Sequence, residues 1–395
     1  MTPFQERCIE RSGLSAILEK VLAGRRLSGE DGMTLYTHPD LVAVGALANE
    51  VRERRHGGVA YYIINQHINH TNICVAGCKF CAFYRTARQS DAYVLSTEDV
   101  ERRMREHIDK PIREIHMVGG VNPDLPLAYF EDVIRAMKRV RPDVHVKAFT
   151  MVEIAAMAEN FSMTPGYVMR RLKDAGLGSI PGGGAEILTD HAHQVLFKGK
   201  IDHHAWMDIA KTAHRLGLRT NATMMYGHVE TLEERLEHML LLREAQDETG
   251  GFMAFIPLAF HPENTRLSHL PKPSAADELR NVAVGRLMLD NFDHVKAYWI
   301  MMTPRVAQAA LHFGADDLDG TVVTEEIYHR AGSTSPQMIS VPQMIALIEE
   351  AGLIPVERDS LYRRVTAAGL PASGRAALSP LTLHSEPPRE TARQA

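Results

Sequence analysis

The sequence predicts an α/β protein built on a (β/α)8 barrel of the TIM type, complete or nearly so. Short β-branched or apolar runs, polar turns and helix-period segments alternate along most of the 395-residue chain. No glycine-rich phosphate-binding turn follows an early strand, which disfavours the alternative, an open doubly wound sheet. With 45% hydrophobic and 24% charged residues, the composition is that of a globular protein with one large core.

Eight runs have the length and composition of strands. They are Val59–Ile68, Arg113–Val118, His145–Thr150, Gly178–Pro181, Arg219–Tyr226, Phe252–Phe260, His294–Met302 and, most weakly, Gly320–Val323. Helical patterns separate them, and the apolar stripe that begins at Leu127 ends before Pro142, which cannot continue a helix. Three further helix starts carry an N-cap residue with an acidic residue three positions later: Ser96 with Asp99, Thr231 with Glu234, and Ser274 with Asp277.

Segments on both sides extend the predicted barrel core, which covers residues 57–356. Residues 1–56 are expected to form two or three polar helices, an N-terminal extension that covers one barrel end. A helix is predicted at Val341–Ala351, and residues 357–395 form a C-terminal extension. From about residue 366 Ala, Pro, Ser, Gly and Arg dominate, a composition typical of disorder.

Charge and hydropathy exclude several classes of protein. The 44 basic and 49 acidic residues are dispersed, and without a basic stripe we expect no nucleic-acid partner. No apolar run approaches 18 residues, so no membrane span is predicted. The first ten residues carry charges instead of the apolar core of a signal peptide, which predicts a cytoplasmic protein.

Three of the four cysteines, Cys74, Cys78 and Cys81, follow the first predicted strand with the spacing C-x3-C-x2-C. They lie too close together for a disulfide framework, and three cysteines cannot all be paired with one another. Structural zinc wants four protein ligands. His67, His70 or Cys8 could in principle add a fourth, but no second C-x2-C or H-x3-H follows. Three thiolates on a cuboidal iron–sulfur cluster leave one iron open to an exogenous ligand. Cys8 stands apart and is interpreted as an incidental thiol.

The segment around these cysteines resembles the radical S-adenosylmethionine (SAM) superfamily. From about Leu27 to Val356 the chain is similar to the menaquinone and deazaflavin branch, over the stretches His70–Cys74, Val118–Pro123, Ser179–Ile187, Asn221–Thr231 and Asp247–Phe252. Within that branch, three stretches resemble the aminofutalosine synthases more than the dehypoxanthine futalosine cyclases: Ile256–Thr265, Lys296–Trp299 and Gly314–Val322.

The resemblance implies a [4Fe–4S] cluster on Cys74, Cys78 and Cys81, with SAM bound at the open iron and consumed as a co-substrate. It implies addition of the 5′-deoxyadenosyl radical to 3-[(1-carboxyvinyl)oxy]benzoate, with rearrangement and decarboxylation, in the futalosine route to menaquinone. A low-potential donor such as flavodoxin or ferredoxin would supply the electron. Two alternatives stay open: the cyclase or another enzyme of the branch, and an iron–sulfur electron-transfer or structural metal protein.

The resemblance also implies which residues contact SAM: Phe80, Gly119, Gly120, Glu186, Tyr226, Gly227 and Glu230. Phe80 would pack on the adenine, and Glu186 matches a position that holds the ribose hydroxyls. The Gly119–Gly120 turn would meet the methionyl amine through backbone groups. Val121 stands where an acidic residue is often found, which argues against side-chain recognition of the amine at this turn. The alternative role for each glutamate is to favour the start of the following helix.

Polar residues in the predicted strands are candidates for binding an anionic substrate. Asn65, His67 and Asn69 share one face of the first strand, an unusually polar set for a packed core. His261 lies just past the sixth strand and Lys296 in the seventh, toward the strand ends where barrel active sites form. We therefore predict substrate contacts at His67, Asn69, His261 and Lys296, with hydrogen-bond support of other residues as the alternative. No catalytic residue is assigned.

Overall fold

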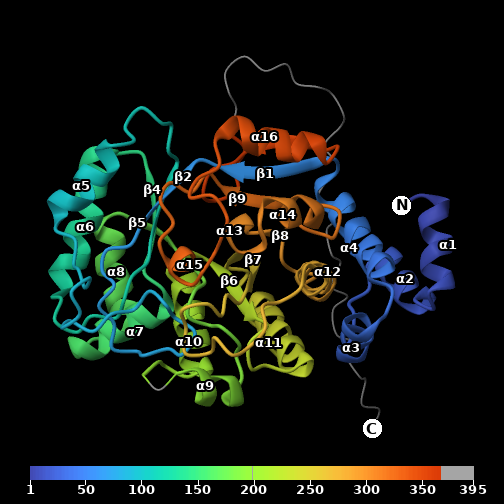
Figure 1. Cartoon of the computed structure of the whole chain (residues 1–395), viewed down its shortest axis with the longest axis horizontal. Coiled ribbons are helices and arrows are strands. Elements are labelled where there is room, and N and C mark those ends of the chain that lie inside the picture. Colours follow the sequence, from blue (N-terminus) through green and yellow to red (C-terminus); the bar gives the residue numbers. More distant parts are fainter. Residues whose placement is uncertain (198, 366–395) are drawn as a thin grey trace, which may run out of the picture. The chain divides into compact units, whose positions relative to one another are not determined.

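Seven parallel strands form a curved sheet at the centre of the computed structural model (Figure 1). In spatial and chain order they are β2 (Asn65–Ile68), β3 (Glu114–Met117), β4 (His145–Ala148), β5 (Leu177–Ile180), β6 (Arg219–Tyr226), β7 (Phe252–Ala259) and β8 (His294–Val295). The structure describes residues 1–197 and 199–365, and Met1–Val365 form one unit. The predicted disorder after about residue 366 lies outside the described residues.

A second sheet closes the ring. β1 (Val59–Ile63) runs parallel between β9 (Asp317–Gly320) and β10 (Ile354–Glu357). Single parallel bridges, Lys296 to Asp317 and Gln66 to Val323, join β8 to β9 and the end of β9 to β2. The predicted first strand is therefore one run divided at Ile64 between the two sheets. With β9 as the eighth member, the predicted (β/α)8 barrel is confirmed.

Helices alternate with the strands and surround them (Figure 1). They are α5 (Thr97–Arg105), α6 (Leu127–Val140), α7 (Met151–Asn160), α8 (Pro165–Ala175), α9 (Asp190–Leu196), α10 (His203–Arg215), α11 (Leu232–Thr249), α12 (Ala275–Met288), α13 (Trp299–Met302), α14 (Pro304–Ala310), α15 (Ile327–Arg330) and α16 (Val341–Glu350). The N-caps predicted at Ser96, Thr231 and Ser274 all accept the expected backbone hydrogen bond. None of the described helices is long and apolar enough to cross a membrane.

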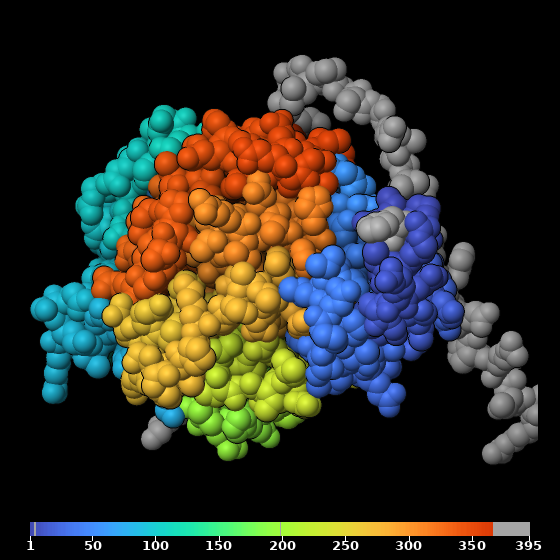
Figure 2. All heavy atoms as spheres, turned by 45° about the vertical axis from the view of Figure 1, so that its right-hand side comes forward, coloured from blue at the N-terminus to red at the C-terminus, as the bar shows by residue number. Residues whose placement is uncertain are grey.

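The N-terminal extension consists of four helices: α1 (Pro3–Arg11), α2 (Ser15–Leu22), α3 (Gly29–Thr37) and α4 (Leu41–His56). α4 packs against α12, and α3 packs against both α11 and α12. The extension thus lies against the outer helical layer and has four helices, whereas the sequence predicted two or three helices over one barrel end. Figure 2 shows it as a blue surface next to the yellow and orange segments. The domain boundaries drawn at residues 57 and 356 stay predictions.

Two predicted strands differ from the structure. Of His294–Met302 only His294–Val295 is a strand, and Trp299–Met302 form the buried helix α13. A short apolar run without a period does not distinguish a buried strand from a buried helix, which explains the error. The last strand lies at Asp317–Gly320 instead of Gly320–Val323, because two of its charged residues pair inside the barrel with Arg358 and Lys296.

Candidate active site at the barrel mouth

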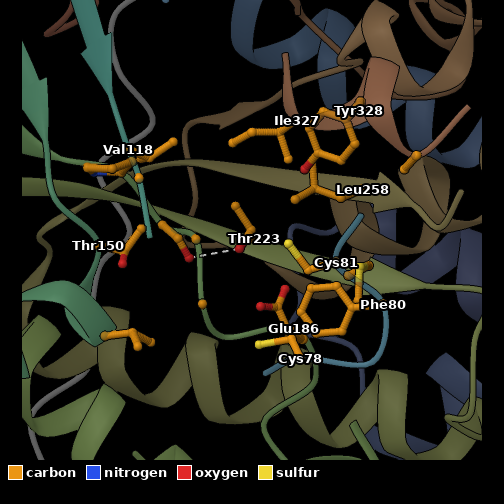
Figure 3. Close-up of a pocket in the computed structure, with 18 of the residues that line it drawn as sticks. Cys78, Phe80, Cys81, Val118, Thr150, Glu186, Thr223, Leu258, Ile327 and Tyr328 are labelled. Carbon is orange, nitrogen blue, oxygen red and sulfur yellow. Dashed lines mark hydrogen bonds between the residues drawn. The ribbon is translucent and has the colours of Figure 1, made fainter. Parts of the chain in front are cut away.

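A cavity of about 280 Å³ opens among the loops that follow the strands. Parallel barrel strands all end on one side, so these loops meet there. All three clustered cysteines line the cavity, together with residues from every strand end between β2 and β9. In Figure 3, Cys78, Phe80, Cys81 and Glu186 lie toward one end of the cavity and Thr150 toward the other.

The cysteine loop is fastened to its surroundings by backbone hydrogen bonds. The amide of Cys74 donates to the carbonyl of Arg85 (2.9 Å), so the loop returns on itself. Val75 donates to Val121 in the turn after β3, and Lys79 donates to Leu196 at the end of α9, both at 2.9 Å. These contacts hold the three thiols against the cavity wall.

The chemistry and spacing of the thiols fit an iron–sulfur cluster. Burial raises the pKa of Cys78 to about 12 and also raises the pKa of Cys81, so their thiolates need a metal charge nearby. The three thiols come from one loop with the C-x3-C-x2-C spacing and all line the same cavity, as the protein ligands of one cluster must.

Cys8, in contrast, is exposed on α1 and does not line the cavity. This is the position expected of an incidental thiol.

The carboxylate of Glu186 lies beside the cysteine loop. It accepts from the ammonium of Lys200 at 2.6 Å, and that ammonium also lies over the rings of Phe80 (5.1 Å) and Phe197 (4.7 Å). The glycine turn before Glu186 approaches β6 closely: a Cβ on Gly182 would lie 2.5 Å from the carbonyl oxygen of Asn221. Phe80, Glu186 and Lys200 thus form one wall of the cavity.

The turn after β3 approaches the cysteine loop so closely that only glycine fits. A Cβ on Gly120 would lie 2.1 Å from the carbonyl oxygen of Ile73, and one on Gly119 would lie 2.4 Å from the ring of His70. Gly119 and Val121 line the cavity. Of the predicted SAM contacts, Phe80, Gly119 and Glu186 are therefore brought together with the cysteines, and Gly120 packs behind them.

The three residues predicted at the end of β6 lie elsewhere. Tyr226, Gly227 and Glu230 are not among the cavity-lining residues that the described chain provides. Glu230 accepts hydrogen bonds from the amides of Gly227 (2.6 Å) and His228 (2.9 Å) and pairs with Arg235 (2.7 Å). Burial alone would raise the pKa of Glu230, but His228 and Arg235 outweigh it and lower the pKa to about 2. A role for these residues in binding adenine stays a prediction.

Three of the four predicted substrate contacts, His67, Asn69 and His261, line the cavity. Nε2 of His67 and Nδ1 of His261 are buried and have no hydrogen-bond partner in the described part of the chain. Lys296 does not line the cavity; it pairs with Asp319 (2.7 Å), which does. Direct substrate contact by any of the four stays a prediction.

Sequence reasoning missed several cavity residues: His116, Glu153, Lys200, Tyr298, Asp319 and Tyr328. His116 is paired in register with His67, and the two rings stack with centroids 4.6 Å apart. The signal that could have found His116 is the alignment of β2 with β3, two adjacent polar strands. Lys200 and Glu153 carry no local signal of this kind, because packing between distant segments brings them to the cavity.

Comparison with known proteins assigns the family. Residues 68–242 match the model of the radical SAM superfamily, and residues 249–369 match that of the CofH/MqnC C-terminal region. The chain is 46% identical over 363 residues to aminodeoxyfutalosine synthase of Thermus thermophilus, covering 91% of this chain and 98% of that protein. It is 38% identical over 350 residues to cyclic dehypoxanthine futalosine synthase of Halalkalibacterium halodurans, covering 88% and 94%.

Among solved structures, the FeFe-hydrogenase maturase HydG from Carboxydothermus hydrogenoformans has the same fold, with a TM-score of 0.69 and 16% identity over 92% of this chain and 86% of that one. The fold, the cysteine loop and the sequence relatives agree. The chain belongs to the radical SAM superfamily, whose members use a [4Fe–4S] cluster and SAM, and it is a radical SAM enzyme with the CofH/MqnC type of C-terminal region.

Proposed function

We propose that the chain is an aminofutalosine synthase of menaquinone biosynthesis, which adds the 5′-deoxyadenosyl group of SAM to 3-[(1-carboxyvinyl)oxy]benzoate with rearrangement and decarboxylation. The observation that carries the proposal is the 46% identity to a named aminodeoxyfutalosine synthase along 98% of that relative. Identity to the named cyclic dehypoxanthine futalosine synthase is 38%.

The location of the synthase-like stretches supports the proposal. Ile256–Thr265 contributes Ile256, Leu258, Phe260 and His261 to the cavity. Lys296–Trp299 contributes Tyr298, and Gly314–Val322 contributes Asp319. The parts of the chain that favour the synthase over the cyclase therefore lie where a substrate would bind.

The cavity wall suits a reactive radical. Met225, Ile256, Leu258 and Phe260 offer apolar surface that excludes water from the reacting atoms. When bound and reduced, the cluster supplies the electron that cleaves SAM. The protein's part is to hold the benzoate in one orientation beside SAM.

Unpartnered polar atoms provide the means of orienting the two ligands. His67 Nε2, His261 Nδ1 and Asn221 Oδ1 are buried without partners in the described structure. Burial lowers the pKa of both His67 and His261, which favours neutral rings. Nε2 of a neutral His67 can donate to a substrate carboxylate. Nε2 of His261 donates to the carbonyl of Met301 (3.0 Å), so its Nδ1 accepts, as Asn221 Oδ1 does, from a ligand hydroxyl or N–H group. Flavodoxin or ferredoxin as the electron donor and a cytoplasmic location belong to the same proposal.

The test follows the adenosine. The reconstituted enzyme is given dithionite, the carboxyvinyloxy benzoate and SAM labelled in its adenosine ring under anaerobic conditions, and products are identified by mass spectrometry. The synthase places the label in an aryl-ketone nucleoside, with free 5′-deoxyadenosine only as a side product. Label solely in 5′-deoxyadenosine, with the benzoate unchanged, would overturn the proposal and favour the cyclase.

A further inference from the structure

Glu153 is a buried carboxylate at the cavity that no family resemblance singled out. It lies in the first turn of α7, with a residue exposure of 4%, and lines both the main cavity and a neighbouring cavity of about 140 Å³. One carboxylate oxygen accepts from the amide (2.8 Å) and hydroxyl (2.9 Å) of Thr150, and the other accepts from the amide of Gly119 (3.1 Å).

All three donors are neutral, and this distinguishes Glu153 from the other carboxylates that line the main cavity. Glu186 and Asp319 each pair with a lysine, and Glu325 pairs with His329. Glu153 has no lysine or arginine within 4.0 Å in the described part of the chain, where the nearest cationic candidate is His70, whose Nε2 lies 4.0 Å away. Burial lowers the pKa of His70 to about 3, so that ring is neutral.

A carboxylate in this position is suited to a ligand that brings its own N–H donor or positive charge. Burial without a cation raises the pKa of Glu153 to about 7, because the buried negative charge is poorly solvated. A ligand ammonium or amino group would stabilise that charge. One carboxylate oxygen already accepts two hydrogen bonds from Thr150. The other oxygen accepts a single hydrogen bond, from Gly119, and can accept another.

The surroundings indicate which ligand this is. Gly119 N–H donates to Glu153, and the next residue, Gly120, approaches Cys74 so closely that a Cβ would lie 2.9 Å from the cysteine Cβ. The Gly119–Gly120 turn therefore connects Glu153 to Cys74, a predicted cluster ligand. Glu153 also lines the cavity in which cluster and cofactor must both bind. Val121, the other side chain of this turn at the cavity, is apolar and offers nothing to an amino group.

We propose that the carboxylate of Glu153 binds the α-amino group of SAM by accepting a hydrogen bond from it. The group stays an N–H donor whether it is free as an ammonium or bound to iron as an amine, so the contact suits both states. This inference rests on the superfamily membership and not on the identity of the second substrate.

The experiment measures binding without turnover. Isothermal titration of the oxidised, reconstituted enzyme compares SAM with an analogue in which hydrogen replaces the α-amino group. In Glu153→Gln we expect the preference for SAM over the analogue to fall about tenfold or more relative to the unaltered enzyme, as for a lost charged hydrogen bond. Affinity for the analogue should change little.

Glu131→Gln is the matched control. This buried glutamate pairs with Arg171 and does not line the cavity, so the variant should lower stability and keep the preference for SAM. Equal weakening of both ligands in Glu153→Gln, or no change in either, would overturn the proposal and leave Glu153 as a residue that fastens the turn.

Iron content is measured for every variant. If Glu153→Gln does not take up a cluster, Glu153→Asp keeps the charge and withdraws it by one methylene. Its preference for SAM should fall in the same direction by a smaller factor, and an unchanged preference there would equally contradict the contact.

Discussion

The lower half of the barrel keeps its buried charges in ion pairs, whereas the mouth combines ion pairs such as Glu186 with Lys200 with buried polar atoms that have no partner in the described chain. Toward the strand N-terminal ends, charged side chains come in pairs: Glu114 with Lys147, Asp316 with Arg286, and Asp317 with Arg358. At the mouth, imidazole and amide atoms of His67, His261 and Asn221 are buried with no partner in the described chain, beside three thiols.

The ion pairs of the lower half contribute to stability, whereas the unpartnered polar atoms at the mouth are available for binding a ligand. A buried pair whose two members lie away from the cavity cannot bind a ligand, although removing one member is costly. An unpartnered buried polar atom costs about 1–3 kcal/mol and is tolerated where a ligand later satisfies it. Lys296 and Asp319 mark the boundary, because their ion pair presents only Asp319 to the cavity.

The largest expected effect concerns the mouth. Replacing Cys74, Cys78 or Cys81 by Ala should abolish or alter the visible absorption of the cluster and eliminate SAM cleavage, since each thiol is predicted to be one of three protein ligands. Iron content and the visible spectrum are the measurements. Cys8→Ala, on the exposed face of α1, is the control and should keep both. Loss of the cluster in that control would contradict a three-cysteine site.

A smaller loss, confined to stability, is expected in the lower half. Arg286→Met leaves Asp316 buried without its guanidinium partner and should reduce the free energy of unfolding by about 3–5 kcal/mol. Calorimetry measures this, and cluster content at low temperature should be unchanged. The double variant with Asp316→Asn should recover part of the loss. A single variant as stable as the parent would show that this pair contributes nothing.

An intermediate effect on binding is expected for Glu186, at the mouth. Glu186→Ala should weaken SAM binding by about 1–3 kcal/mol, the cost of a hydrogen bond lost to a group that then stays unpaired. Titration with SAM measures it. Glu131→Ala is a matched control, because this buried glutamate pairs with Arg171 and does not line the cavity. Equal affinities for the two variants would remove Glu186 from the SAM site.

The smallest effect is expected for an ion pair on the exposed surface. Arg26 joins the N-terminal extension to Asp247 and Asp290, and its side chain is 40% exposed. Arg26→Ala should cost less than about 1 kcal/mol because water and salt screen such pairs. Thermal unfolding at low and high salt checks this: the gap between parent and variant should shrink in salt, and a gap above about 2 kcal/mol would show a structural role.

Local patterns in the sequence predicted most of the fold and the centre of the site. Strand periodicity, N-caps and the C-x3-C-x2-C spacing are all carried by neighbouring residues. What depends on register or on distant packing was missed. His116 reaches the cavity because β3 aligns with β2, and Lys200 reaches it from beyond α9. Asp317–Gly320 did not resemble a strand because its charges are neutralised by partners far away in the chain.

The division of the first strand has a consequence for how the protein is made. Val59 pairs with Ile354 and Tyr61 with Asp317, so β1 cannot form its strand pairs until β9 and β10 have been synthesised. At about 5–20 residues per second, that wait lasts roughly 15–60 seconds. The cysteines leave the ribosome soon after β1, long before the barrel can close around them. We therefore expect the nascent chain to pass through a period of exposed thiols, in which oxidation and foreign metals compete with cluster delivery.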